Sequence, residues 1–280
     1  MAFKYVRTQQ DGGVLTATLH HPPRNFLRTG MVYEIRELMA QAAGDEAVKV
    51  VVVTGGVEGY FIAHADLEAV RSTDPSNEGA LKHYQAWHAM MDSLGACPAV
   101  VIAAVNGHAT GGGCEVALAA DLRFMARGPY LTGLLESQLN ILAGSGGTQR
   151  MARLLGPGKA LELMLEGRLL SPEEALAAGL VNRLYAAGEL MACTMEFAQR
   201  LASRPRAVLA SIKQAVRQGM DLPLAQGLAR ERELFLPLVA SPAAQARLTE
   251  AARLYAEQPE AAFPEIMRQL GVPMPPQESR

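Results

Sequence analysis

Uninterrupted hydrophobic runs and one alternating segment predict strands in the first part of the chain. The runs at 48–56 (VKVVVVTGG) and 99–107 (AVVIAAVNG) are rich in β-branched residues, which is typical of strands buried on both faces. At 13–21 (GVLTATLHH) apolar and polar residues alternate, and the prolines that follow end the pattern. These three segments predict the first strands of a sheet.

Apolar residues at helical spacing separate the predicted strands. Met31 and Ile35 stand four positions apart within 29–43, and Thr29 is a candidate N-cap for this helix. The segment 79–94 returns to the same periodicity. Because strands alternate with helices, we expect βαβ units with right-handed crossovers and a largely parallel sheet. The pattern therefore predicts an α/β fold.

Short helical segments dominate the chain after about residue 146. One of them, 171–179 (SPEEALAAG), carries signals at both ends. Ser171 can cap it, Pro172 occupies its first turn and Gly179 stops it. The second half of the chain is therefore expected to be mainly helical.

Two domains are predicted, with a hinge at Pro205. Residues 1–205 would form the α/β core that carries the site, in a chain long enough to bury a sizeable core. Residues 206–280 begin with helical sequence rich in Ala, Leu, Gln and Arg, as in an appendage that forms an interface. We expect this region to serve oligomerisation and to cover the site.

Composition and charge exclude several classes of protein. Apolar residues make up 49% of the chain and charged residues 19%, which is ordinary for a soluble globular protein. The net charge of −2 gives no reason to expect nucleic acid or an anionic membrane as partner. The three cysteines are too widely spaced for a zinc site or a disulfide framework. With no signal-peptide pattern and no apolar run long enough for a bilayer, we expect a cytoplasmic protein.

Glycines and an isolated carboxylate mark the segment 107–121 (GHATGGGCEVALAAD) as candidate chemistry. The glycines stand at a predicted helix start, where exposed N–H groups favour negative charge, such as a developing oxyanion. Glu115 lies among apolar residues, so it must be paired, protonated or catalytic. The alternative interpretation is a plain turn in which Glu115 faces solvent or pairs with Arg123 or Arg150.

A second glycine cluster follows another isolated acid. The cluster at 143–150 (AGSGGTQR) has neither the Walker A lysine nor the G-x-G-x-x-G pattern, so it does not indicate a nucleotide site. Just before it, Glu136 stands among leucines in LTGLLESQLN. Two acids that each lie beside a glycine turn form a candidate acid–base pair.

The loop at 59–70 (GYFIAHADLEAV) follows a predicted buried strand, which is where α/β proteins place their sites. Small residues at Ala63 and Ala65 would leave backbone N–H groups accessible to a ligand. His64 and Asp66 could belong to a hydrolytic triad, but no G-x-S-x-G serine elbow accompanies them. The simpler role for Asp66 is to cap the turn that follows.

Together these segments resemble the crotonase (enoyl-CoA hydratase/isomerase) superfamily over about residues 5 to 205. The match consists of four ordered motifs: FIAHADLEAV, IAAVNGHATGGGCEVALAADLRF, GLLESQLNILAGSGGTQRMARLLG and LEGRLLSPEEALAAGLVNRLY. The resemblance implies a spiral of ββα units with a C-terminal helical trimerisation region. His64 departs from it, because this position is usually glycine.

The resemblance also implies roles for individual residues. Ala65 and Gly112 would supply the two N–H groups of an oxyanion hole for a CoA thioester, and Glu115 and Glu136 would be the two catalytic acids. Because both acids are present, the leading hypothesis is a lyase that hydrates a 2-enoyl-CoA, as in fatty acid metabolism. The alternatives are an isomerase, a hydrolase or decarboxylase of the same fold, or an acyl-CoA-binding protein without activity.

The same resemblance implies the substrate contacts and the assembly. No metal or separate cofactor is expected, since CoA is part of the substrate, and a homotrimer or a dimer of trimers is the implied oligomer. The residues expected to line the bound substrate are Arg24, Asn25, Ala63, His64, Asp66, Leu67, Glu68 and Gly144.

Overall fold

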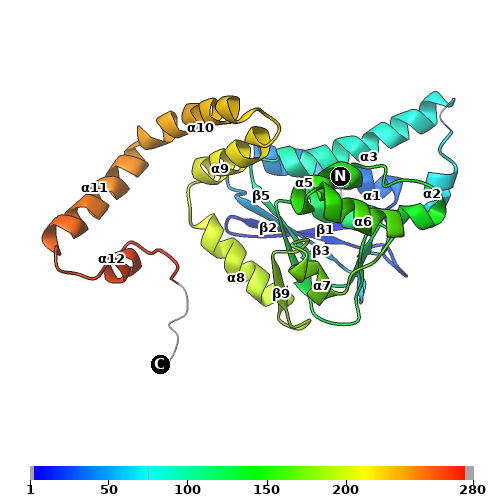
Figure 1. The fold of residues 1–280 in the computed structure, drawn as a ribbon, viewed down its shortest axis with the longest axis horizontal. Helices are drawn as coiled ribbons and strands as arrows, with labels where there is room; N and C mark the ends of the chain where they lie inside the picture. Colours follow the sequence, from blue (N-terminus) through cyan, green and yellow to red (C-terminus); the bar gives the residue numbers. More distant parts are fainter. Residues whose placement is uncertain (1–2, 75, 275–280) are drawn as a thin grey trace. The chain divides into compact units, whose positions relative to one another are not determined.

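The computed structural model describes residues 3–74 and 76–274, which form two compact units. The first unit ends at Lys213 and the second begins at Gln214, so the division falls later than the predicted boundary at 205. Figure 1 follows the chain from the N-terminal strands to the C-terminal helices. No described helix is long and apolar enough to cross a membrane.

A six-stranded sheet forms the centre of the first unit. Its order is β1-β2-β3-β5-β7-β9, and every neighbouring pair is parallel except β1 and β2. Strands β2, β3 and β5 confirm the three predicted from the hydrophobic pattern. The strands of this sheet are β1 (Val6–Asp11), β2 (Val14–Leu19), β3 (Val50–Gly55), β5 (Val100–Val105), β7 (Leu122–Ala126) and β9 (Arg183–Tyr185).

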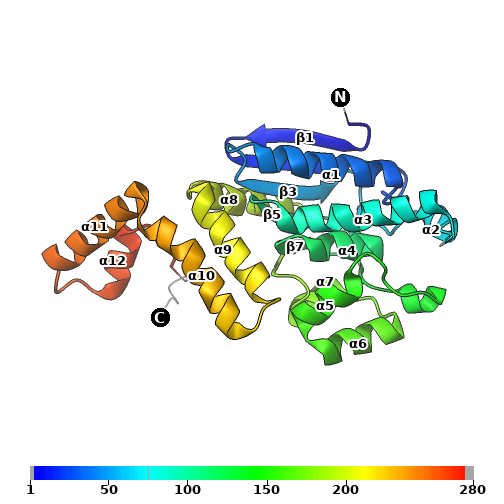
Figure 2. The same ribbon diagram turned by 90° about the horizontal axis from the view of Figure 1, so that it is seen from above.

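Each face of the sheet packs against its own helices. Val51 and Val53 of β3 belong to one hydrophobic cluster, with α1 (Thr29–Gly44) and α3 (Glu78–Ala96), which lie side by side in Figure 2. Val50 and Val52 belong to a second cluster, with α8 (Leu190–Ala202). Because successive residues of a strand face opposite sides, the unbroken valine run supplies both clusters.

A smaller parallel sheet, in the order β4-β6-β8, lies beside the site. Its strands are β4 (Tyr60–Ile62), β6 (His108–Thr110) and β8 (Thr132–Gly133), and each follows directly on a strand of the main sheet. Each pair of strands then leads into helical turns. The chain thus repeats a ββα unit, which confirms the expected crotonase-like α/β fold. The turns that follow are α2 (Leu67–Arg71), α4 (Gly112–Ala119), η1 (Glu136–Leu139) and α5 (Gly147–Leu155).

Two predicted helix caps have different outcomes. Ser171 caps α7 (Pro172–Ala177) and forms a capping box with Glu174, as its sequence indicates. Thr29 is not the N-cap of α1, because the helix already includes it and the cap position falls on Arg28. Between α5 and α7 the chain forms one more helix, α6 (Pro157–Glu166).

Helix α9 (Arg206–Gly219) explains why the division falls after Lys213. The side chain of Arg206 donates to the carbonyl groups of Ala42 and Ala43, and Lys213 forms a largely buried ion pair with Asp121 at 2.7 Å. These contacts tie the first part of α9 to the α/β unit.

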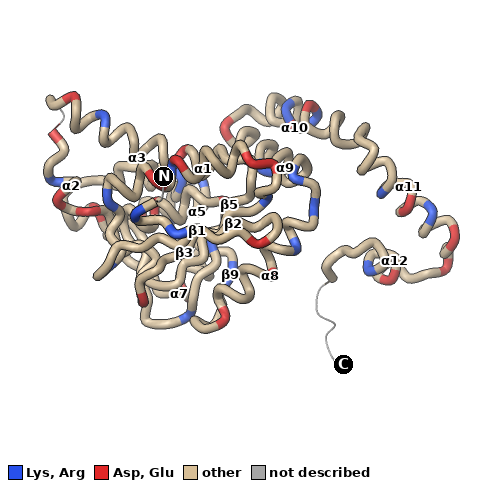
Figure 3. Tube along the Cα trace, turned by 180° about the vertical axis from the view of Figure 1, so that it is seen from behind, with Lys and Arg blue, Asp and Glu red and all other residues tan. Residues whose placement is uncertain are grey.

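The second unit continues with three more helices, α10 (Leu224–Val239), α11 (Pro242–Glu257) and α12 (Phe263–Gln269). Basic and acidic residues are interspersed along the chain (Figure 3), in keeping with its net charge of −2.

Candidate active site

Two backbone amides lie next to each other where the β4 loop meets the start of α4. A Cβ atom built on Gly112 would lie 3.2 Å from the backbone nitrogen of Ala65. Leu27 bridges the loop by bonding to the carbonyl of His64 and the N–H of Asp66, which turns the Ala65 N–H away from Leu27. Among the described residues neither the Ala65 nor the Gly112 N–H has an acceptor. Two N–H groups without acceptors in the described part of the chain thus lie close together, which is what an oxyanion hole requires.

Glu115 lies in the first turn of α4 and is only 4% exposed. Its Oε1 atom accepts hydrogen bonds from the N–H groups of Ser145 at 2.7 Å and Gly147 at 2.9 Å. A Cβ atom on Gly147 would lie 2.9 Å from Oε1, so only glycine permits this approach. Burial raises the pKa of Glu115, and the two N–H donors oppose that shift by favouring the ionised form.

Arg150, one suggested partner of Glu115 in the alternative interpretation, bonds to other groups. Its guanidinium donates to the carbonyl of Ser145 at 3.0 Å and to Asp92 at 2.9 Å. The charge of Glu115 is thus held mainly by backbone dipoles in a buried position, an arrangement that suits acid–base chemistry.

Glu136 begins the short helix η1, and its side chain reaches Gly111, the residue just before α4. A Cβ atom on Gly111 would lie 2.8 Å from its Oε1 atom, and Gly111 has a φ of +51°, which glycine adopts readily. Its Oε2 atom is buried without a hydrogen-bond partner among the described residues. Burial raises the pKa of Glu136 to about 7, its own backbone amide opposes the shift and the charge of Glu115 adds to it.

Burial raises the pKa of both carboxyl groups, but their hydrogen bonding differs. Glu115 receives two N–H donors, which favour its ionised form, whereas Glu136 lacks a partner at Oε2 and keeps a proton more readily near neutral pH. Such a difference between neighbouring carboxyl groups assigns one as base and the other as acid. No group of side chains suited to a metal ion is found in the described ranges.

His64 is held through its Nδ1 atom and through its ring. Its Nδ1 atom is 2.5 Å from the carbonyl oxygen of Ala65, and its ring lies 4.5 Å from that of Phe26. Nothing in the sequence singled out Phe26, because a lone aromatic residue in a loop carries no pattern. The imidazole is thus held between its own loop and a neighbouring ring.

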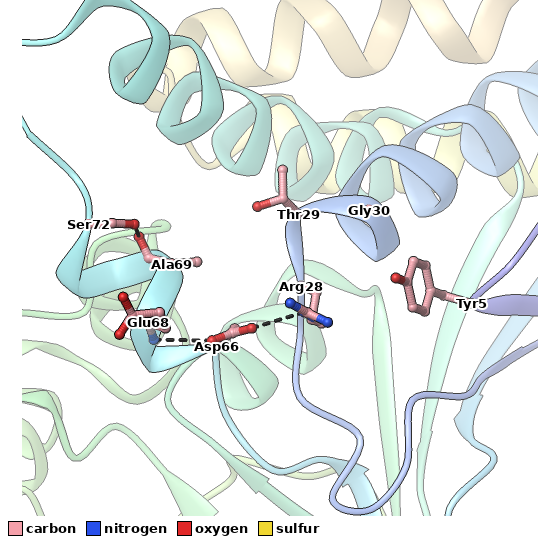
Figure 4. A pocket seen from close by; sticks show the side chains of 8 residues that line it. All are labelled: Tyr5, Arg28, Thr29, Gly30, Asp66, Glu68, Ala69 and Ser72. Atoms are coloured by element: carbon pink, nitrogen blue, oxygen red, sulfur yellow. Dashed lines mark hydrogen bonds and ion pairs between the residues drawn. The ribbon is translucent and has the colours of Figure 1, made fainter.

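The residues after Ala65 border a polar cavity of about 370 Å³ (Figure 4). Asp66 caps α2 by accepting from Glu68 N–H, as the simpler interpretation predicted, and forms an ion pair with Arg28 at 3.0 Å. Asp66 and Glu68, two predicted contact residues, line this cavity. Arg28 and Tyr5 also line it, and these two were not predicted. Leu67 is 48% exposed next to them.

Some predicted contact residues lie deeper than a ligand-binding role requires. Asn25 is fully buried, and its amide donates to the carbonyl groups of Leu19 and Phe61 while its Oδ1 accepts from His21 N–H. Both amide hydrogens are used, so the side chain joins strand ends to the loop. The neighbouring Arg24 is exposed.

Two further predicted positions, Ala63 and Gly144, are held by hydrogen bonds to their carbonyl groups. Ala63 is buried, and its carbonyl accepts from both the N–H and the hydroxyl of Thr110, which holds the loop to β6. Gly144 lies in the loop that supplies the donors of Glu115, and its carbonyl accepts from Tyr84.

Comparison with known proteins gives a consistent picture. A model of the enoyl-CoA hydratase/isomerase family matches residues 9–266. The chain is 38% identical over 226 residues to human mitochondrial enoyl-CoA hydratase domain-containing protein 2, covering 79% of this chain and 76% of that protein. It is 34% identical over 229 residues to the 2,3-dehydroadipyl-CoA hydratase of Escherichia coli, covering 81% and 88%.

Solved structures show the same likeness in three dimensions. The crystal structure of an enoyl-CoA hydratase from Geobacillus kaustophilus superposes with a TM-score of 0.85 at 34% identity. The match covers 89% of this chain and 94% of that one.

Proposed function

The chain belongs to the enoyl-CoA hydratase/isomerase family, and on this premise we propose that it adds water across the double bond of a 2-enoyl-CoA thioester. The observation that carries the proposal is the pair of carboxyl groups, Glu115 and Glu136, which lie near the start of α4 and differ in their hydrogen bonding. A hydration needs one group to take a proton from water and another to deliver one to carbon.

In the proposed reaction the thioester oxygen accepts hydrogen bonds from the N–H groups of Ala65 and Gly112. Ionised Glu115 takes a proton from water as the water oxygen bonds to C3, and the π electrons move towards the thioester oxygen. The resulting enolate is stabilised by the two amides, whose loss individually typically costs about 10²–10³ in rate. Protonated Glu136 then delivers its proton to C2, and proton exchange with solvent restores both acids.

The remaining predicted contacts extend the same proposal. The thioester would lie along Ala65, with the CoA moiety passing Asp66, Leu67 and Glu68 toward the cavity that Arg28 borders. No metal or separate cofactor takes part. The C-terminal helices, with exposed apolar residues such as Leu224, would assemble the chain into a trimer or a dimer of trimers.

Isomerisation of a 3-enoyl-CoA is the second candidate, because it needs only one proton-carrying acid and Glu136 is suited to that task. Product analysis with a 2-enoyl-CoA and a 3-enoyl-CoA separates the two. We expect the 2-enoyl ester to give a 3-hydroxyacyl-CoA, and Glu115→Gln to abolish that product. Conversion of the 3-enoyl ester alone, unaffected by Glu115→Gln, would refute the hydratase proposal in favour of the isomerase.

A further inference from the structure

The carboxylate of Glu115 depends on a loop that has little rigidity of its own. Residues 143–147 include glycines at 144, 146 and 147, yet this loop must hold the N–H groups of Ser145 and Gly147 at 2.7 and 2.9 Å from Oε1. These donors oppose the effect of burial on the pKa of Glu115, and the charges of Arg150 and His88 do so to a smaller extent. The orientation of the donors therefore affects how readily Glu115 is ionised. Something outside the loop has to fix them.

Helix α3 reaches this loop at two points. The hydroxyl of Tyr84 donates to the carbonyl oxygen of Gly144 at 2.8 Å. About two helical turns further on, Asp92 holds Arg150, whose guanidinium donates to the carbonyl of Ser145 at 3.0 Å. The hydrogen bonds from Tyr84 and Arg150 reach different peptide groups of the loop.

The Gly144 carbonyl and the Ser145 N–H belong to one peptide group, which is planar. Tyr84 therefore holds the oxygen end of the same rigid unit whose nitrogen end donates to Glu115. A hydrogen bond at the carbonyl also polarises the N–H and strengthens the bond that it makes. Arg150 donates to the carbonyl of the next peptide group. The N–H of that group belongs to Gly146, which does not donate to Glu115.

We propose that Tyr84 is a positioning residue for Glu115, acting through the Gly144–Ser145 peptide group. This inference rests on the proposed function for its kinetic consequences but not for its effect on the carboxyl group. Removing the hydroxyl leaves the peptide plane free to tilt and its N–H less polarised. The Ser145 bond to Glu115 then weakens, and the pKa of Glu115 rises further.

Tyr84→Phe tests this, with Tyr33→Phe as a matched control. Both tyrosines are 43% exposed, and the hydroxyl of Tyr33 also contacts α3, at Nδ1 of His83, without touching the loop. For hydration of a 2-enoyl-CoA we expect Tyr84→Phe to lower kcat about 3- to 10-fold with little change in KM. The acidic limb of its pH profile should move to higher pH. Tyr33→Phe should match the wild type in kcat, in KM and in the position of the acidic limb.

A second readout does not need turnover. The carboxyl titration of Glu115, followed by ¹³C NMR of labelled protein and assigned with Glu115→Gln, should move to higher pH in Tyr84→Phe only. An unchanged titration, or a rise in KM with kcat and the acidic limb unaltered, would overturn the proposal for Tyr84. Full hydration activity in Glu115→Gln would instead overturn the proposed function and leave the titration as the test of Tyr84.

Discussion

Glu136 should make the folded protein less stable as pH rises, and Glu136→Gln should remove that effect. In the folded protein burial raises the pKa of Glu136 to about 7, compared with 4.5 for an exposed glutamate. Below pH 4.5 the side chain is protonated in both the folded and the unfolded chain, so it contributes no pH dependence. Between 4.5 and 7 the unfolded chain binds fewer protons, so stability falls as pH rises and the loss is complete above 7.

The size of this loss follows from the difference between the two pKa values. Each pKa unit corresponds to about 1.4 kcal/mol, so the difference limits the loss of unfolding free energy to about 3 kcal/mol. Because the carboxyl group is partly exposed, solvent screening reduces the expected loss to about 1–2 kcal/mol. An enzyme that keeps such a group in place trades stability for function, as active sites often do.

Urea unfolding of the wild type and Glu136→Gln at pH 5 and pH 8 measures this effect. From pH 5 to pH 8 the unfolding free energy of the wild type should fall by about 1–2 kcal/mol more than that of the variant. The variant should also lose hydration activity. Glu231→Gln, at an exposed position of α10, controls for the loss of one charge. If the difference in unfolding free energy between Glu136→Gln and the wild type is the same at both pH values, the environment assigned to Glu136 is wrong.

Three other predictions follow from the same contacts. Gly111→Ala should remove activity, because its Cβ atom would lie 2.8 Å from Oε1 of Glu136 at a φ of +51°; a steady-state assay showing wild-type kcat would contradict this. Lys213→Ala should cost about 3–5 kcal/mol of unfolding free energy, since it leaves the charge of Asp121 buried without its ammonium partner. Denaturant unfolding measures it, and a loss under about 1 kcal/mol would argue against a structural role for that pair. Finally, kcat/KM for a 2-enoyl-CoA should fall above about pH 7 as Glu136 loses its proton, whereas a profile that climbs through pH 7 would exclude it as the acid.

The sequence was most informative where burial leaves a clear pattern. The valine run of β3 predicted a strand covered on both faces because every residue of it is apolar, and the two hydrophobic clusters account for it residue by residue. The edge strand β1 was missed because all but its first residue are exposed and polar, so no alternation marks it. The strands of the small sheet, three residues long or fewer, leave no periodic signal either.

The candidate site shows the same division. Glycines and isolated acids stand out in a sequence, so Gly112, Glu115 and Glu136 were predicted and the structure brings them to one end of α4. Asn25 was expected at the ligand, but its burial depends on long-range packing that one sequence does not reveal. Tyr84 was missed for the same reason, because its hydrogen bond to Gly144 joins residues 60 positions apart.

The central claim is that two glutamates with different hydrogen bonding catalyse a hydration beside an oxyanion hole. Turnover of a 2-enoyl-CoA in ²H₂¹⁸O, followed by mass spectrometry, tests it most directly. We predict a 3-hydroxyacyl-CoA with one ¹⁸O at C3 and one non-exchangeable ²H at C2, formed at least about 10²-fold more slowly by Glu115→Gln and by Glu136→Gln. Release of free CoA, a shifted double bond without ¹⁸O, or full activity in either variant would contradict the claim.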